Sequence, residues 1–249
     1  MQKKIGKILI AFLFSVLLFP NMNVYAQDTM TVTSQDELKT ALENKDVSTI
    51  ILGNDIETTE KINVLRSVTI DGNGHTMKYV GTFGNDHSND KTTWSGIYLL
   101  QFYKTEGILK NIKLTGGNAG LLINGATVQI EGMLDVSDNG FGGIELGQGA
   151  AVQSFAHIIL TDTSNIINTT ESKTTPTLWV PQDSTSAIIE RNGIKENLTP
   201  GVELTLKEIN DLLNTSENPN TSDSFMLYLL VGILGTISLG YGYHKANQN

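Results

Sequence analysis

Short apolar strings that recur at a nearly constant spacing constrain the fold of this chain most strongly. One set repeats after 24 and then 23 residues, at 95–103, 119–127 and 142–150. A second set repeats after 23 and then 24 residues, at 111–114, 134–137 and 158–161. An earlier pair, 49–52 and 68–71, is related by 19 residues. A period of about 20–25 residues with short strands in each repeat is typical of a solenoid.

Each repeat is too small to bury an apolar face alone, so the repeats must stack and pair their backbones along the stack. The alternation within the strings fits such a stack, since Ile112 and Leu114 would face inward while Lys113 faces outward. Strands at regular spacing also occur in an ordinary β-sandwich, which stays open as the alternative.

Two stretches carry a resemblance to a known family. They are TIILGNDIETTEKINVLRSVTIDGNG with the following His75, and LKNIKLTGGNAGLLINGATVQIEGMLDVSDN. They resemble the pectate-lyase-like right-handed parallel β-helix, and most closely its adhesin-type members on bacterial surfaces. The resemblance spans roughly residues 34–170 and implies that a helix caps the open edge of the first coil.

Local signals define both ends of the folded part. A capping box from Ser34 to Glu37 predicts a helix at about 35–44, with its apolar positions on one face. Near the other end, Asn192-Gly193 predicts a hairpin, and a second capping box from Thr205 to Glu208 predicts another helix. We therefore expect a mainly β protein, with a short right-handed parallel β-helix over 27–175 and a hairpin and helix cap over 176–214.

The first 26 residues have the pattern of a secretory signal peptide. Three lysines precede an apolar run from Ile8 to Phe19, and small residues stand before an expected cleavage between Ala26 and Gln27. A signal peptidase is therefore an expected partner. The apolar run is too short for a membrane anchor.

The C-terminal region predicts a transmembrane helix at 224–243. No charge occurs from Phe225 to Tyr243, a length that can cross the hydrocarbon core of a bilayer, and a short tail, 244–249, follows. Tyrosine and phenylalanine stand at both margins of the span, as they do at membrane interfaces.

A linker at 215–223 precedes this span and contains Asn218, Pro219, Asn220, Thr221, Ser222 and Asp223. The order of this motif, an apolar span and a short basic end resembles a cell-wall sorting signal. The resemblance implies that a sortase-type transpeptidase attacks the carbonyl of Thr221 and joins it to an envelope amine. Asn218 and Ser222 stand where that family has Leu and Gly, so a span that stays in the membrane is the alternative.

Composition excludes several classes of function. The net charge of −9 becomes −12 for residues 27–222, so the exported part would repel nucleic acid. The chain has no cysteine, which excludes disulfides and thiolate metal sites. We expect no cofactor and no metal site, with Ca²⁺ at turn carboxylates as an unsupported alternative.

Candidate catalytic residues are few. A lyase of the resembled fold uses a basic residue, for which Arg66 is a candidate, and a hydrolase needs paired acids. Asp71, Asp135, Asp138 and Glu145 are candidates for such a pair, although the aspartates stand where tight turns favour Asx residues. We expect no catalytic residues.

Aromatic side chains suggest where a ligand would bind. Trp94 and Tyr98 lie at the edge of an irregular polar insert, where they could stack on a sugar or anchor a protein. We expect an adhesin-like protein, anchored to the wall or membrane of a Gram-positive-type cell, that binds a host or envelope glycan or protein. A wall-tethered polysaccharide lyase or glycoside hydrolase, and a structural envelope component, are the alternatives.

Overall fold

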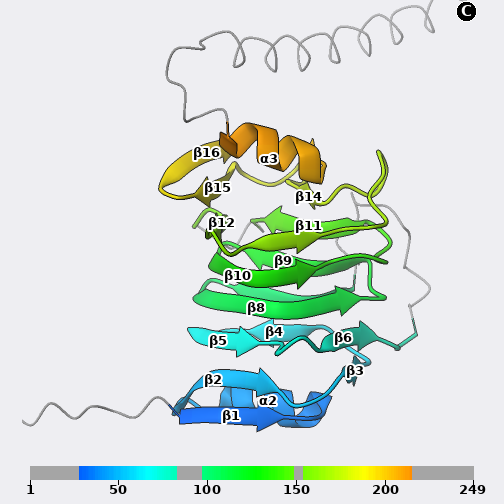
Figure 1. The fold of residues 1–249 in the computed structure, drawn as a ribbon, viewed down its shortest axis with the longest axis vertical. Coiled ribbons are helices and arrows are strands. Elements are labelled where there is room, and N and C mark those ends of the chain that lie inside the picture. The colour runs from blue at the N-terminus through cyan, green and yellow to red at the C-terminus, as the bar shows by residue number, and fades with distance from the viewer. Residues whose placement is uncertain (1–27, 83–96, 149–153, 215–249) are drawn as a thin grey trace, which may run out of the picture.

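The computed structural model describes residues 28–82, 97–148 and 154–214. These residues form a mainly β protein with two sheets and two helices (Figure 1). Most neighbouring strands within each sheet are parallel, and the strands of one sheet lie behind those of the other in this view. The expectation of a mainly β chain with parallel strands is confirmed.

The larger sheet has 11 strands. Eight of them follow one path, and β3, β6 and β13 pair beside it. Its strands are β1 (Asp28–Val32), β2 (Val47–Leu52), β3 (Ile56–Thr58), β5 (Val68–Asp71), β6 (Thr76–Tyr79), β8 (Glu106–Thr115), β10 (Thr127–Asp135), β12 (His157–Leu160), β13 (Asn165–Ile167), β15 (Ala187–Arg191) and β16 (Ile194–Leu198).

The smaller sheet has six strands, and from β4 onward the chain passes repeatedly between the two sheets. Its strands are β4 (Ile62–Val64), β7 (Tyr98–Tyr103), β9 (Ala119–Asn124), β11 (Gly142–Gly147), β14 (Leu178–Trp179) and β17 (Glu203–Leu204).

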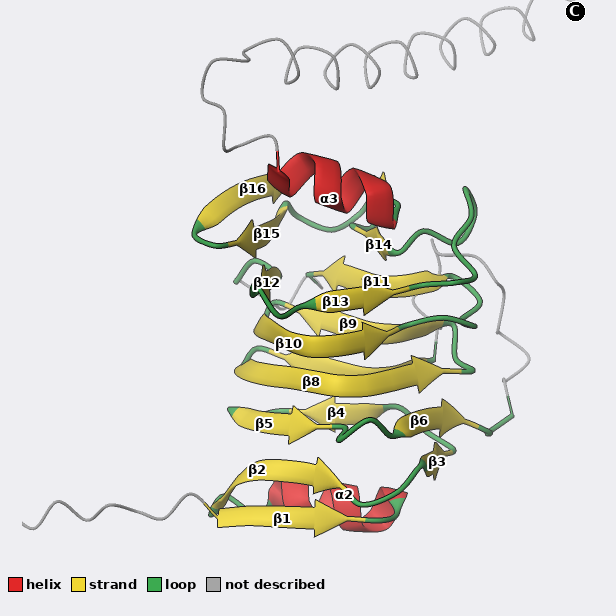
Figure 2. Ribbon diagram, viewed as in Figure 1, coloured by secondary structure: helices red, strands yellow, loops and turns green. Residues whose placement is uncertain are grey.

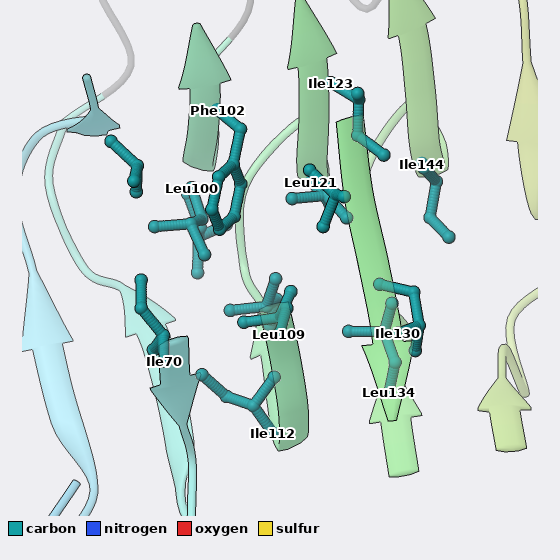
Figure 3. Packing of buried hydrophobic residues seen from close by; sticks show 14 of the residues in the cluster. Ile70, Leu100, Phe102, Leu109, Ile112, Leu121, Ile123, Ile130, Leu134 and Ile144 are labelled. Atoms are coloured by element: carbon teal, nitrogen blue, oxygen red, sulfur yellow. The ribbon is translucent and has the colours of Figure 1, made fainter. Parts of the chain in front are cut away.

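The core lies between the sheets and consists of columns of aliphatic side chains. Paired positions in the larger sheet place fully buried residues one above another, namely Ile50, Ile70, Leu109, Ile130 and Leu160. A facing column in the smaller sheet is formed by Ile62, Leu100, Leu121, Ile144 and Leu178. Figure 3 shows the two sets pointing toward one another. Burial of these side chains is the main force that holds the sheets together.

The strand register corrects most of the repeat alignments expected from the sequence. Only the 23-residue step, which places Ala119 beside Gly142, is confirmed. Leu100 pairs with Leu121, so the preceding step is 21 residues rather than 24. Ile158 pairs with Val128 and not with a residue of 134–137. The letters of the strings were thus recognised correctly, but most of them were placed in the wrong pairing.

A β-bulge explains one of these displacements. Between Glu131 and Leu134, β10 contains one residue more than the facing part of β8. Asn111 on β8 and Gly132 on β10 both have positive φ, of 50° and 61°. The extra residue makes the step from Ile112 to Leu134 22 residues instead of the expected 23.

The two helices lie at opposite ends of the molecule (Figure 2). Helix α2 (Gln35–Glu43) begins after Ser34, whose hydroxyl accepts a hydrogen bond from the Glu37 amide at 3.2 Å, and it buries Leu38, Ala41 and Leu42. The Glu37 carboxylate binds the amide of Thr33 and not that of Ser34, so the predicted capping box is displaced by one residue.

The far end is closed by a hairpin and a helix. Strands β15 and β16 are antiparallel, and the turn between them contains Asn192 and Gly193 at φ of 54° and 81°, as predicted. Helix α3 (Leu206–Asn214) starts with the predicted capping box, because Glu208 accepts a hydrogen bond from the Thr205 amide while the Thr205 hydroxyl accepts one from the Glu208 amide.

The turn after β5 brings two backbone segments very close together. Asp71 accepts a hydrogen bond from the Asn73 amide at 2.8 Å, and the Gly72 amide donates to the carbonyl of Lys110 at 2.8 Å. A Cβ atom on Gly72 would lie 2.4 Å from the carbonyl oxygen of Asn111. This position therefore requires glycine for space, whereas Gly74, at φ 82° with no neighbour within 4 Å, requires it for conformation.

We predict that Gly72→Ala lowers the free energy of unfolding by about 3 kcal/mol, because the strands must move apart to admit the methyl group. The control Gly74→Ala should cost about 1 kcal/mol, the expense of a left-handed residue with open space around it. Urea denaturation of both variants measures the difference. Equal losses would contradict the close approach at Gly72.

Candidate functional site

The outer face of the six-stranded sheet is as deeply buried as its inner face. Strand pairing places Gln101, Leu122, Glu145 and Trp179 in one row across β7, β9, β11 and β14. Their exposed fractions are 8%, 6%, 4% and 2%. A polar and aromatic row that is excluded from water on an outer sheet face is a candidate for function, since such positions are usually solvated.

The centre of this row is a hydrogen bond between a tyrosine and a carboxyl group. The Tyr98 hydroxyl donates to Oε2 of Glu145 at 2.5 Å, across 47 residues of sequence. The Tyr98 ring packs in a cluster with Ala119, Leu122, Phe141 and Trp179 and is 7% exposed. The expectation that Tyr98 offers its ring to a ligand at the surface is therefore corrected, because packing and this hydrogen bond hold the ring inside.

Burial controls the titration of this pair. It raises the pKa of Glu145 to about 7, with a smaller contribution from the negative charge of Asp183, while the hydrogen bond from Tyr98 and the charge of Lys61 act in the opposite direction. Burial also raises the pKa of Tyr98 above its usual range. Glu145 therefore exchanges its proton near neutral pH, as a general acid or base does.

A second feature is an open pocket of about 440 Å³ at the end of the sheet, between α2 and the segment around β4. Leu65 lies in its wall and is 68% exposed. The pocket has four cationic and two acidic side chains in a chain of net charge −9. Its lining is Lys39, Leu42, Glu43, Lys45, Glu60, Lys61, Ile62, Asn63, Leu65 and Arg66.

Arg66, the candidate lyase base, lies in this pocket, where its hydrogen bonds fasten the end of α2. Its Nε donates to the carbonyl of Leu42 at 2.8 Å, and its Nη2 donates to the carbonyl of Ala41 at 2.9 Å. Desolvation lowers the pKa of Arg66. The pocket also contains Glu43 and Glu60, but Glu60 is paired with Lys39 at 2.8 Å. These contacts assign Arg66 a structural role.

The aspartates considered as catalytic acids lie at the ends of strands in the other sheet. Asp71 and Asp135 each accept a hydrogen bond from a backbone amide two residues later, at 2.8 and 2.9 Å. Lys113 lies 3.5 Å from Asp135 and 3.4 Å from Asp138. These are the local bonds of Asx turns, and they do not bring the aspartates to Glu145.

Metal ligation was also assessed within residues 28–82, 97–148 and 154–214. No group of three or more His, Cys, Asp or Glu side chains in these ranges could hold a metal ion. His75 Nδ1 lies 3.3 Å from a carboxylate oxygen of Asp55.

Several predicted sites lie outside the described residues. They are the cleavage site at Ala26 and Gln27, the aromatic Trp94, the motif at 218–223 and the span at 224–243. In the parts of the chain that the structure describes, neither helix has the length and hydropathy required for a membrane span.

Sequence reasoning missed the polar row beside Glu145. Gln101 and Glu145 stand within otherwise apolar strings, LLQFY and GGIELG, and a polar residue at such a place was the available signal. It was not usable without the register, because an outward polar side chain normally lies in water. Trp179 was recognised only as part of a strand.

Comparison with known families adds one finding. Residues 29–138 match a family model described as "Putative pectate lyase-like adhesive domain". This segment resembles an adhesive domain. The match supports an adhesin-like protein of the cell surface, and it includes the residues of the α2 pocket but ends before Glu145. The searches of curated proteins and of solved structures return no match.

The raised pKa of Glu145 predicts a pH-dependent stability. The folded state holds the proton more tightly than the unfolded chain, whose pKa is near 4.5, so the contribution of Glu145 falls as pH rises from 4.5 to about 7. The loss amounts to about 3 kcal/mol and is complete above pH 7. Glu145→Gln keeps an acceptor for Tyr98 without a charge, so it should remove this decline.

Chemical denaturation at a series of pH values measures the effect. Glu57→Gln, at an exposed position of β3, makes the same change of charge and should keep the wild-type decline. A Glu145→Gln curve parallel to that of the wild type would show that the carboxyl is not desolvated.

Proposed function

We propose that this chain is a surface-displayed adhesin that binds its ligand without transforming it. The match of residues 29–138 to an adhesive domain is the observation that carries the proposal. We propose further that residues 27–175 form a short right-handed parallel β-helix, in which each turn contributes a strand to both sheets. The parallel pairing and the buried columns support this architecture, with α2 and the β15–β16 hairpin with α3 as its caps.

The α2 pocket is the proposed binding surface. It lies within the matched segment, and it is open, whereas the row around Glu145 is buried. An apolar side chain that is 68% exposed, Leu65, stands beside the exposed cation Lys45. A ligand that combines an apolar face with negative charge would therefore fit, as a host or envelope glycan or protein can provide.

One observation favours a glycoside hydrolase as a second candidate. The pKa of Glu145 is about 7, as for a general acid, and the charge of a second carboxylate, Asp183, acts on it. A carboxyl that is 4% exposed cannot meet a polysaccharide without a change of conformation, so binding at the open pocket is the better supported function.

Binding to a printed array of host glycans, envelope polysaccharides and matrix proteins tests the proposal. Cells that display the full chain should adhere to a member of the array, and Leu65→Asp should weaken this adhesion at least about tenfold by placing a charge at the apolar wall. Phe155→Asp is the matched control, because Phe155 is 53% exposed and does not line the pocket. Equal losses in both variants, or cleavage of an arrayed polysaccharide, would contradict the proposal.

We also propose that the chain is exported, loses residues 1–26 and is joined to the wall through Thr221. The adhesive match supports a surface location. Mass spectrometry of protein released by wall digestion should then find a C-terminal peptide that ends at Thr221 and carries an envelope amine. A membrane-bound protein that still ends at Asn249 would instead establish the retained span.

A further inference from the structure

A lysine amine and a glutamine amide meet on neighbouring strands of the six-stranded sheet. Lys61 directly precedes β4, and Gln101 lies in β7, which pairs with β4 in parallel through Asn63. The Lys61 Nζ donates a hydrogen bond to Oε1 of Gln101 at 2.9 Å, across 40 residues of sequence. The amine nitrogen is therefore held beside the amide carbon, in the range from which a nucleophile attacks.

The surroundings favour the reactive form of this amine. Gln101 is 8% exposed and Lys61 is half-buried. Burial lowers the pKa of Lys61, and the charge of Glu145 only partly opposes this effect. Within the described ranges, no ion pair of Lys61 is found. A lysine that is desolvated beside a neutral amide holds its proton less tightly than a lysine in water.

An acid lies on the same outer row. Leu122 of β9 separates Gln101 from Glu145 of β11, so two strand spacings, about 10 Å between Cα atoms, separate the two residues. Two long side chains can cover this gap. Tyr98 holds the carboxyl, and the charges of Lys61 and Asp183 act on it. Because its pKa is about 7, a large fraction of Glu145 carries a proton at neutral pH.

We propose that Lys61 and Gln101 form an intramolecular isopeptide bond, with Glu145 as the group that carries the protons. The proposal does not depend on the ligand-binding function, because it concerns a covalent link within the sheet. The chain has no cysteine, so such a bond would be a covalent staple that needs no disulfide.

The reaction is a balanced transfer of the acyl group. The lone pair of the neutral Lys61 Nζ attacks Cδ of Gln101, and the electrons of the C=O bond move to Oε1. Nζ then loses a proton, the bond from Cδ to Nε2 breaks, and Nε2 takes up a proton and leaves as ammonia. Glu145 gives a proton to the leaving nitrogen and recovers the one that Nζ releases. An amine and a primary amide thus become a secondary amide and ammonia, with no change of oxidation state.

Peptide mass spectrometry of the full chain tests the proposal. After trypsin, the cross-linked protein should yield one branched species that contains residues 46–66 and 92–104, with Lys61 uncleaved and the mass lower by one ammonia. Separate peptides 46–61 and 92–104 in the wild-type protein, without the branched species, would overturn the proposal. This measurement needs no variant and therefore does not depend on whether a variant folds.

Three variants then assign the roles. Lys61→Arg keeps the positive charge but should abolish the branched species and lower the midpoint of thermal unfolding, while Lys78→Arg, at an exposed position of β6, should change neither. Glu145→Gln should leave the two peptides separate in a protein whose circular dichroism matches that of the wild type. Full cross-linking in Glu145→Gln would overturn the assignment of proton transfer to Glu145.

Discussion

The ladder of hydrogen bonds between parallel strands is the constraint on which the rest of the structure depends. Because parallel strands in register place equivalent residues beside each other, every inward position continues into a column, such as Ile50, Ile70, Leu109 and Ile130. The same ladder continues the outward positions into rows. The core and the buried polar row on the outer face of the smaller sheet are therefore two consequences of one register, and a slip of one residue would exchange them.

The sequence predicted local structure well because local structure depends on neighbouring residues. The Thr205–Glu208 capping box and the Asn192-Gly193 turn were identified from spacing and residue type, and both occur in the structure. Register depends on partners about 20 residues away and on bulges whose position the period does not reveal. Gly132, with its positive φ, shifts the pairing of Leu134 by one residue, and nothing in the period distinguishes it from an ordinary turn glycine.

The candidate site was predictable only in part, for a related reason. The pattern of alternation identifies which residues point outward, but it assumes that outward means solvated. Gln101, Glu145 and Trp179 point outward and are nevertheless 8% exposed or less. Tyr98 was selected as an aromatic side chain able to contact a ligand, whereas its hydroxyl is committed to Glu145. What decided its role was a hydrogen bond between residues 47 positions apart, which no local pattern contains.

Lys61 connects the two features of the smaller sheet, since it lines the α2 pocket and also donates to Gln101. A half-buried ammonium group whose hydrogen bond goes to a neutral amide has a desolvation cost that an isolated amide acceptor offsets poorly. Formation of an amide with Gln101 would remove that charge and its cost, and it would leave Lys39, Lys45 and Arg66 as the cations of the pocket. Arg66 is occupied by the carbonyls of α2 and Lys39 by Glu60, so Lys45 and the exposed Leu65 would then define what the pocket can bind. The cross-link and the binding surface thus place different demands on adjacent residues of one short segment.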